Sequence, residues 1–127
     1  MSVVETAIQK QVLLALSRAG CMVWRSNVGL AYPVSEIKSG RPNPRPVIYG
    51  VPGQPDILGI APGGRGLGVE VKTSQGRRSA QQKAFQRAWQ AVGGIYIIAR
   101  SGEEALEQLH QHLVGVSQGG GVEDDRR

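Results

Sequence analysis

Near the middle of the chain, Asp56, Glu70 and Lys72 combine two acidic side chains with one amine, a set that metal-assisted cleavage of a phosphodiester can use. The segment from Gly66 to Lys72 alternates apolar residues with Gly68, Glu70 and Lys72, which is the period of a β-strand. On such a strand the apolar residues mark the core side. Glu70 and Lys72 then project together from the other face, roughly 7 Å apart along the strand, so both can act at one place.

Asp56 follows Gly53-Gln54-Pro55 at the head of the apolar segment 57–60, where a proline is tolerated at the start of a strand. The segment 62–66, Pro-Gly-Gly-Arg-Gly, has the composition of a hairpin turn between the strands 57–60 and 67–72. If this turn closes a hairpin, Asp56 and Glu70 lie on paired strands. Their carboxylates can then point at a common site.

Two carboxylates and a backbone carbonyl are ligands that a small, hard Mg²⁺ ion takes from a protein, with waters and a substrate phosphate in its remaining positions. The bound ion lowers the pKa of a water and neutralises charge on the phosphate, and Lys72 adds a cation for the scissile phosphate. A simpler alternative fits the same residues. Glu70 and Lys72 can be an ion pair on a solvated face, with Asp56 only a cap at the start of its strand, because such a D…ExK pattern often arises by accident.

The surrounding sequence predicts the elements that must hold these residues. Apolar spacing indicates helices over 6–19, 79–92 and from Ser101 through Leu113, and apolar runs indicate strands at 22–24 and 95–99. The proline-rich, basic segment 28–52 is expected to be an irregular insertion or a loose hairpin. The predicted order is α-β-(insertion)-β-β-α-β-α, an α/β fold with a mixed sheet flanked by helices. It forms one domain over residues 1–115, followed by a disordered tail at 116–127.

Composition restricts the setting of this domain. Its 127 residues suit a single core, and one cysteine cannot form an intrachain disulfide framework. No signal peptide or membrane-spanning run is evident, so we expect a soluble cytoplasmic protein of a bacterial or phage-infected cell. The formal net charge of +5 favours polyanionic partners, a weak signal by itself because many basic proteins bind no nucleic acid.

Several separate motifs, in the right order, resemble the virus-type replication-repair nuclease family, VRR-NUC, a branch of the PD-(D/E)xK nuclease superfamily. The likeness covers most of the chain except the central insertion and the tail. It is carried by Glu5, Arg25-Ser26-Asn27-Val28-Gly29, Gly53-Gln54-Pro55-Asp56, Gly68-Val69-Glu70-Val71-Lys72, Gly76, Ser79-Ala80-Gln81-Gln82-Lys83, Gly93-Gly94 and Ala99-Arg100-Ser101. The resemblance implies a restriction-endonuclease-like core that cuts DNA with Mg²⁺ or Mn²⁺.

By this resemblance Asp56, Glu70 and the carbonyl of Val71 are metal ligands, and Lys72 is the catalytic lysine. Gln82 matches a glutamine of the family on the helix after the catalytic strand, and Glu5 matches the acidic residue of the first helix that completes the metal site. Each of the last two has a purely structural alternative. Gln82 can cap its own helix through Ser79-x-x-Gln82, and Glu5 can be a first-turn residue favoured by the helix dipole.

Basic and polar residues outside the Asp-Glu-Lys set are candidates for contact with DNA. The resemblance suggests that Arg25 and Asn27 lie near the substrate, although a structural role suits them equally. A solvated charged surface also explains the remaining candidates for phosphate contacts, which are Lys38, Arg41, Arg45, Arg65, Arg77 and Arg78. His110 and His112 lie on different faces of the last predicted helix, and we assign them no role.

The expected activity is that of a metal-dependent DNA endonuclease in replication or repair, specific for branched DNA such as a Holliday junction. Stand-alone members of the family resemble junction-resolving enzymes and act as homodimers, which suits symmetrical cutting of a four-way junction. Two alternatives remain open. One is a DNA-binding module that kept the fold and lost catalysis. The other is a restriction-type enzyme that reads short duplex sequences, for which we identify no base-reading element.

Overall fold

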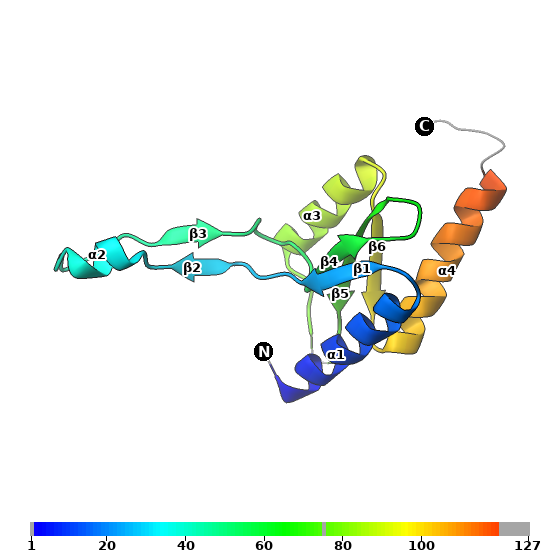
Figure 1. Cartoon of the computed structure of the whole chain (residues 1–127), viewed down its shortest axis with the longest axis horizontal. Helices are drawn as coiled ribbons and strands as arrows, with labels where there is room; N and C mark the ends of the chain where they lie inside the picture. The colour runs from blue at the N-terminus through cyan, green and yellow to red at the C-terminus, as the bar shows by residue number, and fades with distance from the viewer. Residues whose placement is uncertain (1, 75, 120–127) are drawn as a thin grey trace.

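The computed structural model describes residues 2–74 and 76–119 (Figure 1). Its main sheet has four strands, in the spatial order β1 (Met22–Arg25), β4 (Ile57–Ile60), β5 (Gly66–Val71) and β6 (Ile95–Ala99). β4 is antiparallel to both β1 and β5, whereas β5 and β6 are parallel. The predicted mixed sheet and the hairpin between β4 and β5 are therefore confirmed, as is the predicted order of elements.

Helices cover both faces of this sheet. α1 (Val3–Arg18) and α4 (Gly102–Gly119) pack against each other and against one face. The core between them and the sheet includes Val12 and Leu16 from α1, Leu109 from α4, and Leu67 and Val69 from β5. The apolar residues of the segment 66–72 thus face the core, as their alternation predicted.

α3 (Ala80–Ala91) covers the opposite face at β5 and β6, and Trp89 is its main contact. The indole nitrogen of Trp89 donates a hydrogen bond to the carbonyl of Ile95 at 3.0 Å. The same ring lies where a Cβ at Gly66 or Gly94 would be, so these glycines allow the helix to approach closely. The helix predicted over 79–92 ends at Ala91, and Val92 is its C-cap with 84% of its surface exposed.

The segment between β1 and β4 is a long hairpin, which settles the choice between an irregular insertion and a hairpin. β2 (Gly29–Ala31) pairs antiparallel with β3 (Val47–Tyr49), and the short helix α2 (Val34–Lys38) lies at the far end. This arm, residues 28–52, projects away from the body of the protein (Figure 1). No residue of the arm is buried, so it contributes nothing to the hydrophobic core.

The ends of the protein differ from the sequence-based expectation. α1 begins at Val3 rather than Thr6, because Ser2 and Glu5 form a capping box at its start. α4 continues to Gly119, past the predicted end of the domain at residue 115, and residues 120–127 of the predicted tail lie outside the described part of the chain. No helix in the described part of the chain has the length and apolar character to cross a membrane.

Candidate functional site

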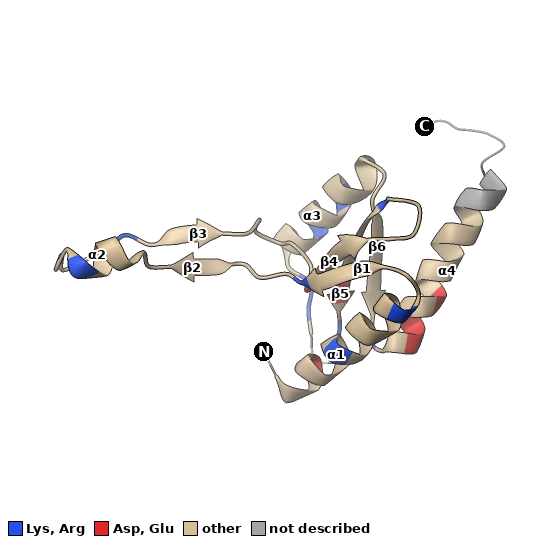
Figure 2. Cartoon of the chain, in the orientation of Figure 1, with Lys and Arg blue, Asp and Glu red and all other residues tan. Residues whose placement is uncertain are grey.

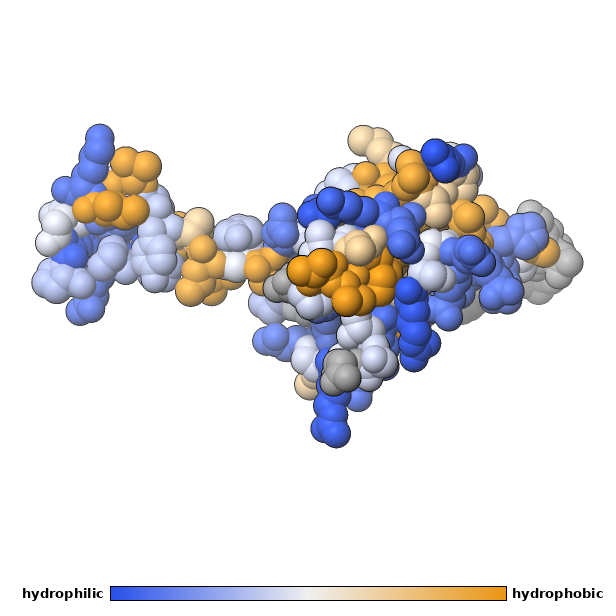
Figure 3. Space-filling model, turned by 90° about the horizontal axis from the view of Figure 1, so that it is seen from below, coloured by the Kyte–Doolittle hydropathy of each residue, from blue (hydrophilic) through white to orange (hydrophobic). Residues whose placement is uncertain are grey.

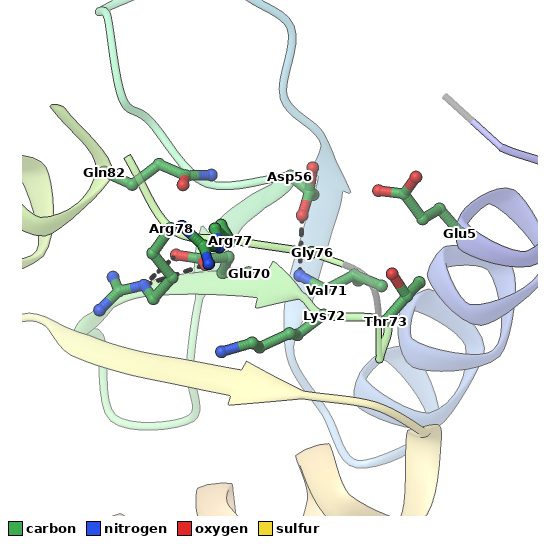
Figure 4. A pocket seen from close by; sticks show the side chains of 10 residues that line it. All are labelled: Glu5, Asp56, Glu70, Val71, Lys72, Thr73, Gly76, Arg77, Arg78 and Gln82. Atoms are coloured by element: carbon green, nitrogen blue, oxygen red, sulfur yellow. Dashed lines mark hydrogen bonds and ion pairs between the residues drawn. The ribbon is translucent and has the colours of Figure 1, made fainter. Parts of the chain in front are cut away.

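A small pocket on the α3 side of the sheet collects most of the residues that the sequence singled out. It has a volume of about 100 Å³, enough for a hydrated ion or one phosphate group (Figure 4). Its lining comprises Glu5, Asp56, Glu70, Val71, Lys72, Thr73, Gly76, Arg77, Arg78 and Gln82. All six residues predicted for metal binding or catalysis, from α1, β5, α3 and the segment before β4, thus meet at one place.

Asp56 is held at the pocket by the backbone of the neighbouring strand. The backbone N–H of Val71 donates a 2.7 Å hydrogen bond to its Oδ2, and the N–H of Ser26 donates to its carbonyl at 2.9 Å. Burial raises the pKa of Asp56, and repulsion from Glu70 and Glu5 raises it further, against the opposing effect of the Val71 N–H. Asp56 is therefore the acid of this pocket whose charge a nearby cation would stabilise most directly.

Glu70 lies in the middle of the sheet and is only 4% exposed, so the alternative of a solvated face is wrong for this residue. Its partner is Arg78 rather than Lys72. The Nε of Arg78 donates to both carboxylate oxygens, at 3.2 and 3.0 Å, and the hydroxyl of Tyr96 donates to Oε1 at 2.9 Å. Both oxygens of Glu70 are thereby engaged, and its negative charge is balanced by a guanidinium.

Arg78 and Tyr96 also contact each other, because the guanidinium lies over the aromatic ring at 5.8 Å from its centre. Burial and the hydrogen bond to Glu70 raise the pKa of Tyr96. For Arg78, burial lowers the pKa, but the bond and charge of Glu70 outweigh that effect and leave it raised. Both groups therefore keep their protons, and both act as donors to Glu70.

Lys72 follows β5, where its backbone N–H donates to the carbonyl of Ala99 at 3.0 Å and so fixes the start of its side chain beside β6. The side chain is partly buried and lines the pocket. The described part of the chain contains no ion pair between Lys72 and Glu70, so it lacks the ion pair that the simpler alternative requires.

Gln82 serves its own helix and still faces the pocket. Its Oε1 accepts a 2.8 Å hydrogen bond from the backbone N–H of Ser79, and the hydroxyl of Ser79 accepts one from the N–H of Gln82. This capping box confirms the structural alternative and leaves the amide nitrogen of Gln82 for the pocket (Figure 4). Gly53 lets the turn before Asp56 pack against the start of α3, since a Cβ there would overlap the backbone of Gln81.

Glu5 likewise bonds to the start of its own helix, α1, and also faces the pocket. Its Oε1 accepts hydrogen bonds from the backbone N–H and the hydroxyl of Ser2, at 3.3 and 3.1 Å. These bonds confirm the predicted first-turn role. In Figure 4 the carboxylate of Glu5 lies on the side of the pocket that faces Asp56. Glu5 can therefore complete a site at Asp56 without leaving its helix.

The types of ligand atom in the pocket suit a hard divalent cation, although their side chains are not arranged as a metal site in this conformation. Among the described residues, no group of three or more His, Cys, Asp and Glu side chains is positioned to hold a metal ion. The reason lies in Glu70, whose two oxygens are turned to Arg78 and Tyr96. The carboxylate and carbonyl oxygens in this small pocket are the ligand type that Mg²⁺ or Mn²⁺ takes, once Glu70 offers an oxygen to the ion.

The other predicted contacts are divided between the pocket and the arm. Arg77 and Arg78 line the pocket, whereas the basic residues of the arm lie far from it, near α2 (Figure 2). Of these, Arg41 pairs with Glu36 at 3.5 Å, and the backbone N–H of Arg45 donates to the same carboxylate at 3.0 Å. Lys38 is the last residue of α2.

Arg25, Asn27 and Arg65 have structural surroundings outside the pocket. Arg25 is the exposed last residue of β1, and the carbonyl of Asn27 accepts a 3.1 Å hydrogen bond from Gln54 at the base of the arm. The Nε of Arg65 donates to the carbonyl of Gly93 at 2.9 Å, which ties the β4–β5 turn to the end of α3. The contact of Arg65 is therefore structural, whereas that of Asn27 involves only its backbone, and a place of Arg25 and Asn27 near DNA stays a prediction.

Two residues of the site were missed in the sequence. Tyr96 belongs to an apolar run that predicted only a buried strand, and its contact with Glu70 depends on the pairing of β5 with β6. Thr73 follows Lys72 and lines the pocket, with nothing in its sequence context to distinguish it. Searches against protein-family models, curated proteins and solved structures find no match to this chain. The family likeness is therefore carried by the motifs alone.

Proposed function

We propose that this protein is a metal-dependent DNA endonuclease of the VRR-NUC type, with a PD-(D/E)xK core. The observation that carries the proposal is the convergence of Asp56, Glu70 and Lys72 in one small pocket, each placed there by a different contact of β4, β5 and β6. A half-buried acidic residue with a raised pKa beside two other acids is the kind of perturbation that marks functional sites.

In this proposal Asp56, Glu70 and the carbonyl of Val71 hold Mg²⁺ or Mn²⁺, and Glu5 completes the site. The bound ion supplies an activated water and charge neutralisation at the phosphate. Lys72 places its ammonium against a non-bridging oxygen of the scissile phosphate, where charge develops during the reaction. The amide nitrogen of Gln82 donates a hydrogen bond that orients the substrate or the attacking water.

The substrate that we propose is branched DNA of the Holliday-junction type. The net charge of +5 favours a polyanion, and basic residues occur in two separated places. Arg77 and Arg78 lie at the pocket, and Lys38, Arg41 and Arg45 lie near the far end of the arm. Basic groups at the pocket and at the end of a long projection suit a substrate with more than one duplex arm.

We further propose a homodimer, for which the arm provides the support. Its strands β2 and β3 carry exposed apolar side chains. Among them are Leu30 at 57% and Ile48 at 67% exposure, which lie opposite each other in the strand pair. Figure 3 shows apolar residues at the surface of the arm as well as on the body. Phosphate groups gain nothing from such side chains, whereas a second copy of the chain can bury them.

Two other functions compete with this proposal. A DNA-binding module without catalysis would need no lysine beside the two acids, so the presence of Lys72 in the pocket favours the nuclease. A restriction-type enzyme would need an element that enters a DNA groove and reads base edges. The arm is the one projecting element in the described part of the chain, and it carries basic residues suited to phosphates near its end.

The test is cleavage of a synthetic four-way junction and of a linear duplex of matched sequence, each with Mg²⁺ or Mn²⁺. We expect faster nicking of the junction. Lys72→Ala should reduce cutting by at least 100-fold while binding is retained, since it removes a contact to the developing charge. Lys10→Ala, at an exposed position on α1, is the matched control. Equal cutting of both substrates would remove the junction specificity, and binding without cutting in either metal would favour the inactive module.

A further inference from the structure

We propose that Arg78 is a positioning residue that exchanges partners when the metal binds. In this structure it holds Glu70, and we infer that entry of a cation at Glu70 releases its guanidinium toward a phosphate of the DNA. The inference rests on the proposed function, since it assumes that Glu70 is a metal ligand. It adds a role for Arg78 that couples metal binding to substrate binding.

The first step of the argument is the geometry of Glu70. The Nε of Arg78 bridges both carboxylate oxygens, at 3.2 and 3.0 Å, and Tyr96 takes one of them as well. In Figure 4 the Arg78 guanidinium and Asp56 lie on opposite sides of the Glu70 carboxylate. Glu70 is thus turned away from the other acids, and a cation shared with Asp56 must take an oxygen that Arg78 now holds.

The second step is charge. Glu70 is 4% exposed, and a carboxylate buried to this degree needs a compensating cation. Arg78 supplies one in the metal-free protein, and a divalent ion supplies one when it is bound. Two cations on one carboxylate repel each other, so each weakens the binding of the other. The exchange keeps Glu70 compensated throughout.

The third step concerns the hydrogen bonds that Arg78 can form after it leaves Glu70. Its Nη2 is buried and has no hydrogen-bond partner in the described structure, so its pairing with Glu70 does not satisfy the guanidinium. Arg78 lies in the segment between β5 and α3, outside any helix or strand, where a side chain can be redirected with little cost to the fold. A phosphate offers several acceptor oxygens in the geometry that a guanidinium fork prefers.

The test compares Arg78→Gln with Arg87→Gln, an exposed arginine on α3 that is not part of the pocket lining. Mn²⁺ binding to the DNA-free protein is measured by isothermal titration calorimetry. Removing the competing guanidinium should tighten Mn²⁺ binding by about 3- to 10-fold in Arg78→Gln and leave it unchanged in Arg87→Gln. Weaker or unchanged Mn²⁺ binding in Arg78→Gln would overturn the exchange, because it would mean that Arg78 only orients Glu70 for the ion.

A second measurement follows the released arginine. Junction binding is compared in EDTA and in Ca²⁺, which occupies oxygen sites while cutting is avoided. Arg78→Gln should leave binding in EDTA unchanged and weaken binding in Ca²⁺ by about 10-fold, because Arg78 reaches the phosphate only after it leaves Glu70. Equal weakening in both conditions would contradict the exchange.

A wild-type measurement protects the test against a variant that does not fold. In ¹⁵N-labelled protein, the Arg78 Nε–H signal should be protected from solvent exchange without metal and should lose that protection when Mg²⁺ is added. Protection that persists at saturating Mg²⁺ would overturn the proposal. Wild-type protein that binds no Mn²⁺ and cuts no DNA would instead refute the proposed function. Metal binding and cutting with no effect of Arg78→Gln would refute the exchange alone.

Discussion

Asp56→Asn should make the metal-free protein more stable while it abolishes cutting. Asp56 is half-buried beside Glu70 and Glu5, and both its partial burial and these charges raise its pKa in the folded protein. The asparagine keeps an acceptor oxygen for the Val71 N–H, which now donates to Asp56 at 2.7 Å. The substitution thus removes the repulsion and most of the desolvation cost but retains the hydrogen bond.

The expected size follows from these opposing effects. A neutral acceptor is weaker than a charged one, which costs about 1 kcal/mol, while removing a buried charge beside two like charges gains more than that. We expect a net gain of roughly 1 kcal/mol in the free energy of unfolding at pH 7, typical of substitutions that relieve a functional site. For a domain of this size the melting temperature would rise by about 4 °C.

The pH dependence of the free energy of unfolding tests the direction of the effect of Asp56→Asn. Because the pKa of Asp56 is higher in the folded protein than in the unfolded chain, the folded state binds the extra proton more readily. The stability that comes from this proton is present below the unfolded pKa, near 3.9, and is lost as the pH rises through the folded value. The advantage of Asp56→Asn should therefore be absent at low pH and appear above the folded pKa.

Thermal unfolding in EDTA and with Mg²⁺ provides the assay. At an Mg²⁺ concentration about 100 times the dissociation constant, the wild type should gain roughly 2.7 kcal/mol, and Asp56→Asn should gain little. The order of stability of the two proteins should then reverse. Glu107→Gln, at an exposed position on α4, is the control and should change stability by less than about 0.5 kcal/mol. An Asp56→Asn protein that is less stable than wild type in EDTA at pH 7 would refute the reasoning.

Two other predictions concern packing and assembly. Gly94→Ala should lower the free energy of unfolding in urea by about 1–3 kcal/mol, because its methyl group would overlap the ring of Trp89, whereas Gly115→Ala on α4 meets open space and should raise it by roughly 0.5–1 kcal/mol. Equal effects of the two substitutions would contradict the packing argument. The combined Leu30→Thr and Ile48→Thr substitutions should convert a dimer to a monomer, as measured by size-exclusion chromatography with light scattering. The circular dichroism spectrum should stay unchanged, because threonine is tolerated in strands. A dimer that persists in this variant would place the interface elsewhere.

Local sequence predicted the parts of the site that are close together along the chain. Alternation in the segment 66–72 identified the face of β5 that carries Glu70, and the glycine-rich turn identified its pairing with β4. Those two inferences bring Asp56 beside Val71. They succeeded because a strand has a fixed period and a short turn pairs its flanking strands, so both depend on neighbouring residues only.

Contacts across longer separations were decided by the tertiary structure. Tyr96 reaches Glu70 because β5 and β6 pair in parallel, with Gly68 opposite Tyr96, and no local pattern specifies that register. Arg78, in the segment before α3, takes Glu70 as its partner although Lys72 is nearer in sequence. The pairing depends on how α3 and its preceding segment pack over β5, which also buries Glu70. Residue types and spacing thus determined which groups are available for chemistry, while the packing of α3 and β6 on β5 determined which of them touch, because burial and charge pairing arise only when separate elements meet.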